Sequence, residues 1–183
     1  MSIENNKERE AAIFRRAFFV VGPESSGTRI TSKILLENGC FGSDKHIQQT
    51  DGLRDPDILN PYDFVAIRRS IPHNKYYPDI EQIYDYLHSA GFENVHTIVT
   101  TRNWNYIARS QVKEGYAGAE SEAILSIQLA YKQIFDSISM PYTISHYTDL
   151  VNDPLGHQNW LCQRIGLEFT KAIEIVDGDL KYK

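Results

Sequence analysis

The sequence predicts an α/β protein in which a central, mainly parallel sheet lies between two layers of helices, a three-layer α/β/α sandwich. Short apolar runs alternate with amphipathic helical segments along the chain, and this alternation is typical of βαβ units. The first apolar run leads directly into a glycine-containing loop and then a helix. The 183 residues show no internal repeat and suffice for one domain with a substantial core.

The predicted strands are short and apolar. The first, residues 17–21, is uninterrupted by polar residues and stops at Gly22, as expected of a strand buried on both faces. Three more strands are predicted at residues 63–68, 95–100 and 142–145.

The predicted helices follow these strands. In the first, residues 28–38, Ile30, Ile34 and Leu35 recur at helical spacing, and Asn38-Gly39 provides a C-terminal stop. Four more helices are predicted at residues 79–90, 104–113, 120–137 and 154–165. Residues 1–16 are expected to form a polar leader. Residues 40–61, rich in Gly, Asp and Pro, are expected to form a long loop, a kind of segment that is often functional.

Composition and charge narrow the class of partner. The net charge of −5 shows no basic footprint, so no nucleic-acid partner is expected. No apolar run approaches the ~20 residues of a membrane span. The polar N-terminus lacks the features of a signal peptide, so a cytoplasmic location is expected by default. Cys40 and Cys162 form no CxxC pair and are expected to be reduced thiols.

The segment GPESSGTR, residues 22–29, predicts a P-loop-type phosphate site. Its two glycines lie five residues apart between a strand and a helix. Glycine lets the backbone curl so that successive N–H groups point inward, and the helix N-terminus adds partial positive charge. Ser25, Ser26 and Thr28 add hydroxyl groups. Arg29 adds a cation whose planar fork suits phosphate or sulfate oxygens.

The loop departs from that of nucleotide triphosphatases. Those proteins place Lys and then Ser or Thr after the second glycine, whereas Thr28 and Arg29 stand here. The lysine that reaches the terminal phosphates of ATP is therefore missing. A simple turn with a serine-capped helix is the alternative interpretation of this segment.

At these residues the chain resembles the sulfotransferase family, whose donor is 3′-phosphoadenosine 5′-phosphosulfate (PAPS). The family's first loop typically has Pro, Lys or Arg, then Ser-Gly-Thr. Here Ser26-Gly27-Thr28 matches, Ser25 stands where the cation is expected, and Glu24 is an additional residue. The resemblance implies that residues 17–183 form a single sulfotransferase-like P-loop domain and that Ser25 to Arg29 bind the 5′-phosphosulfate of PAPS.

A second match follows the third predicted strand. The family has Arg-Asn-Pro there and a serine about eight residues later, both contacting the 3′-phosphate. Arg102 and Ser110 have that spacing, with Asn103 between them and Trp104 in place of proline. The family's basic Arg-Lys-Gly loop near the C-terminus has no clear counterpart, because the final residues offer only Lys181 and Lys183. Either this cover is reduced or another segment supplies it.

A third match concerns catalysis. The family often carries a basic residue and a histidine after its second strand, and Arg68, Arg69 and His73 are present here in shifted order. The resemblance implies that His73 is the base and that Arg68 or Arg69, with Arg29, balances charge on the transferred group. It further implies PAPS as co-substrate, PAP as product, a small-molecule or glycan acceptor and no metal.

The remaining matches are structural. SHYTDLVNDP, residues 145–154, resembles the family's Tyr-Glu-Asp-Leu segment before a helix, with Asp149 or Asn152 as a helix cap. We expect His157 on the surface and His96 and His146 to be satisfied within the sheet layers.

Two other functions remain open. A P-loop kinase or other nucleotide triphosphatase would need a loop lysine and usually an aspartate at a strand end for Mg²⁺. A non-catalytic nucleotide-binding protein on the same fold is the second alternative, since likeness of fold does not establish chemistry. Residues 40–61 and 114–120 are expected to line the acceptor pocket, but the identity of the acceptor and the oligomeric state do not follow from the sequence.

Overall fold

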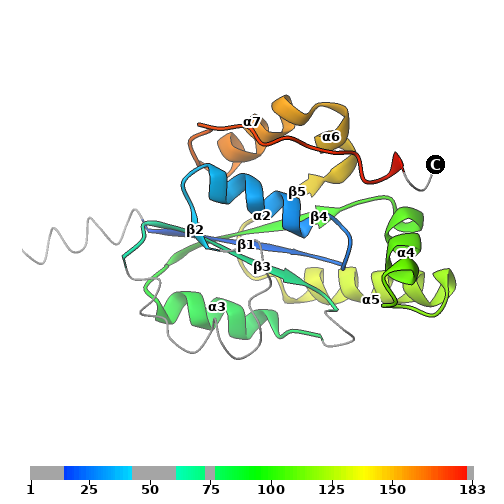
Figure 1. Ribbon diagram of the computed structural model, residues 1–183. Coiled ribbons are helices and arrows are strands. Elements are labelled where there is room, and N and C mark those ends of the chain that lie inside the picture. Colours follow the sequence, from blue (N-terminus) through cyan, green and yellow to red (C-terminus); the bar gives the residue numbers. More distant parts are fainter. Residues whose placement is uncertain (1–14, 43–60, 73–76, 181–183) are drawn as a thin grey trace, which may run out of the picture.

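A computed structural model describes residues 15–42, 61–72 and 77–180 of the chain. These residues form a five-stranded sheet in the order β2-β3-β1-β4-β5, and every neighbouring pair of strands is parallel (Figure 1). The strands are β1 (Arg16–Gly22), β2 (Phe41–Gly42), β3 (Phe64–Ser70), β4 (Asn94–Thr101) and β5 (Tyr142–His146).

Helices lie between β1 and β2, between β3 and β4, between β4 and β5 and after β5, and they cover both faces of the sheet (Figure 1). They are α2 (Thr28–Glu37), α3 (Ile80–Ser89), α4 (Trp104–Lys113), α5 (Glu120–Ser137), α6 (Tyr147–Asn152) and α7 (Pro154–Arg164). The predicted α/β class and the three layers are confirmed.

The alternation of side chains along β1 divides the core in two. Phe18 and Val20 pack with apolar residues of α2, α6 and α7 on one face of the sheet. Phe19 and Val21 pack with residues of α3, α4 and α5 on the other face. All four side chains are fully buried, as the uninterrupted apolar run predicts for a central parallel strand.

Two short elements were not predicted. β2 has two residues and pairs with β3, and it falls in the segment expected to be a loop. α6 has six residues, too few to show a helical period. The helix cap also differs from the prediction: the Asp153 side chain, rather than Asp149 or Asn152, accepts from the Gly156 amide at 3.0 Å and begins α7.

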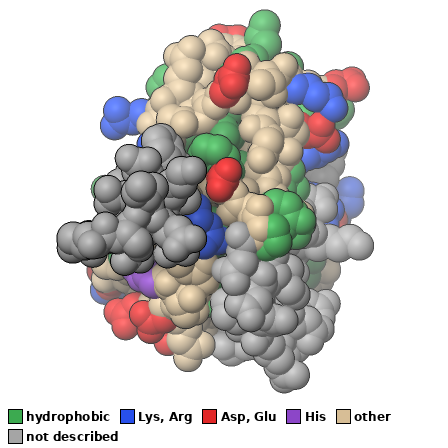
Figure 2. All heavy atoms as spheres, turned by 90° about the vertical axis from the view of Figure 1, so that its left-hand side faces the viewer, with side chains coloured by type: hydrophobic (Ala, Val, Ile, Leu, Met, Phe, Trp, Pro, Cys, Tyr) green, Lys and Arg blue, Asp and Glu red, His purple; other side chains and the backbone are tan. Residues whose placement is uncertain are grey.

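The two ends of the sheet differ in character. Figure 2 faces the amino ends of the strands, where described side chains of both charges and apolar side chains lie in small separate groups. The carboxyl ends, at the right of Figure 1, carry the loop between β1 and α2 and the start of α4. Ligands of open parallel sheets bind at this end, so the candidate site is sought there.

Candidate functional site

The loop between β1 and α2 curls tightly before the helix begins. Ser25 (φ 70°) and Gly27 (φ 107°) both adopt left-handed conformations, and the Ser26 amide donates to the Pro23 carbonyl at 3.0 Å. A Cβ on Gly22 would lie 2.3 Å from Thr100 Oγ1. Close packing against β4 therefore requires glycine at the end of β1.

This loop forms one wall of a cavity of about 640 Å³ at the carboxyl end of the sheet. The other walls come from β3, α4, the residues after α4 and the start of α6. The lining residues are Glu24, Ser25, Gly27, Thr28, Arg29, Ile30, Lys33, Arg68, Ser70, Arg102, Ser110, Glu114, Tyr116 and Tyr147.

The cavity is suited to an anion. Four basic side chains line it, from Arg29, Lys33, Arg68 and Arg102, against two carboxylates. The amino end of α2 faces the same space, and the first amides of a helix have no partner within the helix. Local geometry thus provides positive potential in a chain whose net charge is −5.

Most of the predicted site residues meet at this cavity. It is lined by Ser25, Gly27, Thr28, Arg29, Arg68, Arg102 and Ser110. Ser26 does not line it: its hydroxyl is fully buried and lies 2.6 Å from Thr100 Oγ1, so it ties the loop to β4. His73 lies outside the described residues.

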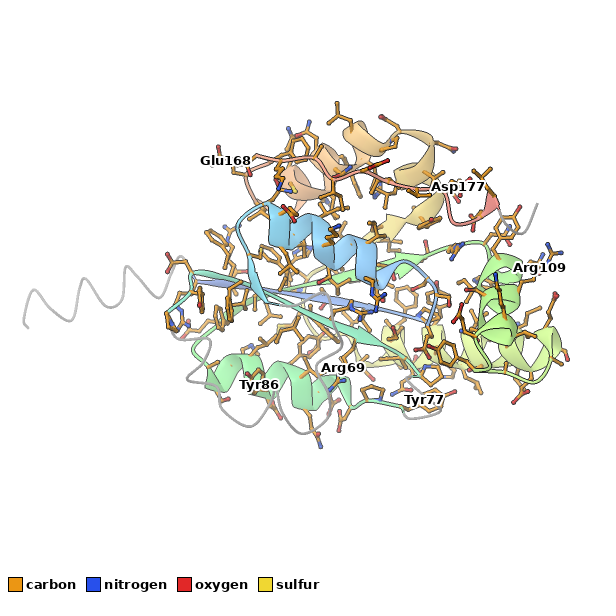
Figure 3. The ribbon with its side chains drawn as sticks, viewed as in Figure 1. Arg69, Tyr77, Tyr86, Arg109, Glu168 and Asp177 are labelled. Carbon is orange, nitrogen blue, oxygen red and sulfur yellow. The ribbon has the colours of Figure 1, made fainter. Side chains whose placement is uncertain are left out.

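The pleat of β3 separates the two adjacent arginines. Arg68 lies on the α2 face of the sheet, where its Nη1 donates to Thr28 Oγ1 at 3.2 Å, and Thr28 Oγ1 lies 3.3 Å from Ser70 Oγ. Arg69 points to the opposite face, toward α3, and does not line the cavity (Figure 3). Both are 3% exposed. Of the two arginines predicted as alternatives, only Arg68 is at the site.

Arg102 is held on several sides. Its Nη1 donates to the Ser25 carbonyl at 2.8 Å, which fixes the loop to the end of β4. Its Nε donates to Asp179 Oδ1 at 2.7 Å, and Nη2 contacts the same oxygen. The guanidinium lies 4.5 Å from the centre of the Tyr147 ring, a cation–π contact. These contacts hold the guanidinium in a fixed place in the wall of the cavity.

The C-terminal segment reaches the site with an acid instead of a base. Tyr147 Oη donates to the Val176 carbonyl at 3.3 Å and accepts from the Gly178 amide at 2.9 Å. These bonds place Asp179, 8% exposed, beside Arg102. Figure 3 shows Asp177, two residues earlier, near the top of α4. Lys181 and Lys183, considered as a basic cover, lie outside the described residues.

Sequence reasoning missed several lining residues. Lys33 follows Arg29 by four residues in α2, a spacing that places two side chains on the same helix face, so this residue could have been found. Tyr147 belongs to residues 145–154, which were predicted to be structural, and Glu114 and Tyr116 belong to residues 114–120, which were expected to line the acceptor pocket. Burial raises the pKa of the Tyr116 phenol, and the Glu24 and Glu114 carboxylates raise it further.

Three of the histidines that the structure describes have structural surroundings, and the fourth, His88, is exposed on α3. His157 was expected on the surface and is buried instead, with Nε2 3.0 Å from Ser145 Oγ; burial lowers its pKa, as it does for His96. His96 Nε2 lies 2.9 Å from Thr143 Oγ1, and His146 Nδ1 bonds Thr101 Oγ1. The last two contacts agree with their expected places in the sheet layers.

Two further observations concern metal sites and membrane-spanning helices. Within residues 15–42, 61–72 and 77–180, no group of three or more His, Cys, Asp or Glu residues is arranged to hold a metal ion. In the same part of the chain, no helix combines the length and apolarity needed to cross a membrane.

Comparison with known proteins identifies relatives in structure alone. No family model matches the chain, and no curated protein matches it. The sulfotransferase domain of the Synechococcus PCC 7002 olefin synthase superposes with a TM-score of 0.61 at 14% identity, covering 92% of this chain and 83% of that domain. The sulfotransferase domain of the curacin biosynthetic pathway gives a TM-score of 0.59 at 13% identity, covering 85% and 75%.

Both similarities extend over most of each chain, so they concern the whole architecture rather than one motif. Identities this low show the fold and leave the activity open. The chain has the fold of sulfotransferase domains, as the resemblance of its loops implied.

Proposed function

We propose that the protein is a sulfotransferase-like enzyme that transfers a sulfuryl group from PAPS to a hydroxyl or amine of an acceptor. One observation carries the proposal: the loop after β1, four basic side chains and Ser110 converge on a single cavity at the carboxyl end of the sheet. The fold shared with sulfotransferase domains supports the same conclusion.

The 5′ end of the donor would bind at the start of α2. The amides of Gly27, Thr28 and Arg29 lie where helix geometry favours phosphate oxygens. Arg29 and Arg68, which both line the cavity, would balance charge that develops on the oxygen between phosphorus and sulfur. The hydroxyl of Thr28, 3.2 Å from Arg68 Nη1, couples this arginine to the loop.

The 3′-phosphate would bind between Arg102 and Ser110. Both line the cavity from the end of β4 and from α4, and Ser110 is only 7% exposed. Arg102 donates to Asp179 through Nε. A phosphate would therefore displace this carboxylate or share the guanidinium with it. Arginine forms its strongest bonds in such paired, charge-assisted geometry.

In the proposed reaction the acceptor oxygen or nitrogen attacks sulfur. A new bond to sulfur forms while the sulfur–oxygen bond to the 5′-phosphate breaks, leaving PAP and a sulfated acceptor. The acceptor's proton passes to a base, for which His73 remains the prediction from sequence. Positioning and charge stabilisation are the main requirements of this class of transfer.

Ligand-induced stabilisation tests the proposal. PAP without Mg²⁺ is expected to raise the melting temperature of the full chain, because a ligand that binds only the folded state stabilises it. Arg102→Gln is expected to reduce this shift, measured from its own ligand-free melting temperature. Arg109→Ala is the matched control, since Arg109 is on α4 and points away from the cavity (Figure 3).

Four results would count against the proposal. No shift with PAP would refute the donor assignment, and a shift with ATP and Mg²⁺ alone would favour a kinase. An unchanged PAP shift in Arg102→Gln would refute the 3′-phosphate assignment. If PAP binds but no sulfated product forms with any acceptor, the protein is a non-catalytic nucleotide-binding protein.

A further inference from the structure

A second, smaller cavity adjoins the first on the side of α5. Its volume is about 260 Å³, below the usual range of about 300–1,000 Å³ for drug-sized ligands. Two residues, Glu24 and Tyr116, line both cavities. The other lining residues are Pro72, Tyr77, Gln111, Ala117, Glu122, Leu125, Ser126 and Leu129.

The walls of this cavity are mostly apolar and open to solvent. Leu125 and Leu129 are 58% and 50% exposed, and they lie one turn apart on the same side of α5. Tyr77, 39% exposed, comes from the segment that leads into α3 (Figure 3). Burial of such surface under an apolar ligand is favourable at about 25 cal/mol per Å².

The charged side chains of the larger cavity are mostly basic, whereas those that line this cavity are acidic. Among the described residues that line it, Glu24 and Glu122 are charged and no Lys, Arg or His occurs. Glu122 Oε2 accepts from the Gly118 amide at 2.7 Å, which holds its carboxylate in place. Glu24 is 7% exposed, so water screens its charge little. The pKa of the Tyr116 phenol is raised first by burial and then by the Glu24 carboxylate, which agrees with a negative charge at this place.

We infer that the smaller cavity binds the acceptor, that this acceptor is a small uncharged or cationic molecule with an apolar body, and that Glu24 selects against anionic acceptors. The inference rests on the proposed function, since it needs the sulfuryl donor in the larger cavity. Glu24 and Tyr116 mark the junction at which an acceptor hydroxyl would meet the donor.

The selection follows from the position of Glu24 in the loop. The β1–α2 loop has a carboxylate at the point where the two cavities meet, and the Glu24 carbonyl accepts from Gln111 Nε2 at 2.9 Å, which ties this part of the loop to α4. A carboxylate or sulfate on the acceptor would face Glu24 and Glu122 together. A hydroxyl or an ammonium group would instead donate a hydrogen bond to Glu24.

Three phenols that differ only in side-chain charge test the inference on the full chain with PAPS. 4-Ethylphenol is neutral, tyramine is cationic and 3-(4-hydroxyphenyl)propionate is anionic. We expect kcat/KM for the neutral and cationic phenols to exceed that for the anionic one by at least roughly fivefold. Glu24→Gln is expected to reduce this ratio, and Glu168→Gln, an exposed carboxylate far from both cavities (Figure 3), is expected to leave it unchanged.

Leu129→Ser provides a second variant that the fold should tolerate, because the side chain is half exposed. It is expected to lower kcat/KM for 4-ethylphenol severalfold while PAP still raises the melting temperature as in the parent. An equal or higher rate with the anionic phenol, or an unchanged ratio in Glu24→Gln, overturns the inference and leaves the proposed function standing. PAP binding without transfer to any of the three phenols also overturns the inference. Absence of PAP binding and of all transfer overturns the proposed function, and the inference with it.

Discussion

Asp179→Asn is expected to strengthen the binding of PAP. In the ligand-free protein, Asp179 Oδ1 accepts from Arg102 Nε at 2.7 Å and also contacts Nη2. A 3′-phosphate needs the same donors of Arg102. Asparagine keeps the shape of the side chain and can still accept one hydrogen bond, but it removes the negative charge that competes with phosphate.

The magnitude follows from the contact. A hydrogen bond to a charged group contributes about 1.5–3 kcal/mol. The side chains of Arg102 and Asp179 are 8% and 11% exposed, so solvent screens their attraction little. Since a tenfold change in affinity corresponds to about 1.4 kcal/mol, PAP should bind roughly ten- to a hundredfold more tightly. The variant itself should be less stable, because breaking a buried ion pair is costly.

Titration calorimetry at one fixed salt concentration measures this change, with the ligand-free melting temperature as a check that the variant is folded. 5′-AMP, which lacks the 3′-phosphate, should gain much less affinity than PAP. Asp136→Asn is a control, since Asp136 pairs with Lys132 on the surface of α5. A folded Asp179→Asn that binds PAP no better than the parent would refute the competition, as would an equal gain for 5′-AMP.

Three other predictions concern the scaffold. Gly22→Ala should destabilise the protein by about 1–3 kcal/mol and weaken PAP binding, because the new Cβ would lie 2.3 Å from Thr100 Oγ1. Urea denaturation measures the loss, and a variant as stable as the parent protein would contradict the close packing. The free energy of unfolding should fall as the pH drops from 7.5 to 5.5, because burial lowers the pKa values of His157 and His96 below the unfolded value of about 6.5 and the unfolded chain then binds more protons. His157→Gln should reduce this dependence without abolishing it, and an unchanged slope would remove His157 as a source. Cys40 and Cys162 should react with iodoacetamide only after unfolding, since burial raises their pKa values to about 12 and about 11. Rapid labelling of the native protein, detected as an increase in intact mass, would show that the thiols are accessible.

The fold could be predicted because local and global signals agree in this sequence. The apolar run of β1 and the helical spacing in α2 each indicate one structure, and glycine stops helices at residues 39, 91 and 166, all with positive φ. β2 and α6 could not be found in this way. A two-residue strand and a six-residue helix are too short for a period, and their formation depends on packing against the rest of the chain.

The site could be predicted where residues follow strands, and less well where distant segments meet. Arg68 and Arg69 are adjacent in sequence, and only the register of β3 decides which faces the cavity. Asp179 lies 77 residues from Arg102 in the chain, so no local pattern links them. Ser26 matched a motif by position, but its hydroxyl serves packing against Thr100 rather than the cavity.

The place of β1 at the centre of the sheet has a consequence for the folding rate. β1 pairs with β3 from Phe64 onward and with β4 from Asn94 onward, and every pairing in the sheet is parallel. No strand can form a hairpin with its neighbour, so each pairing closes a long loop whose entropy is lost before the contacts form. Such non-local pairing favours slower folding than in helical bundles, whose contacts are mostly local. During synthesis the first strand emerges well before either of its partners, so its apolar residues stay exposed until β3 and β4 follow.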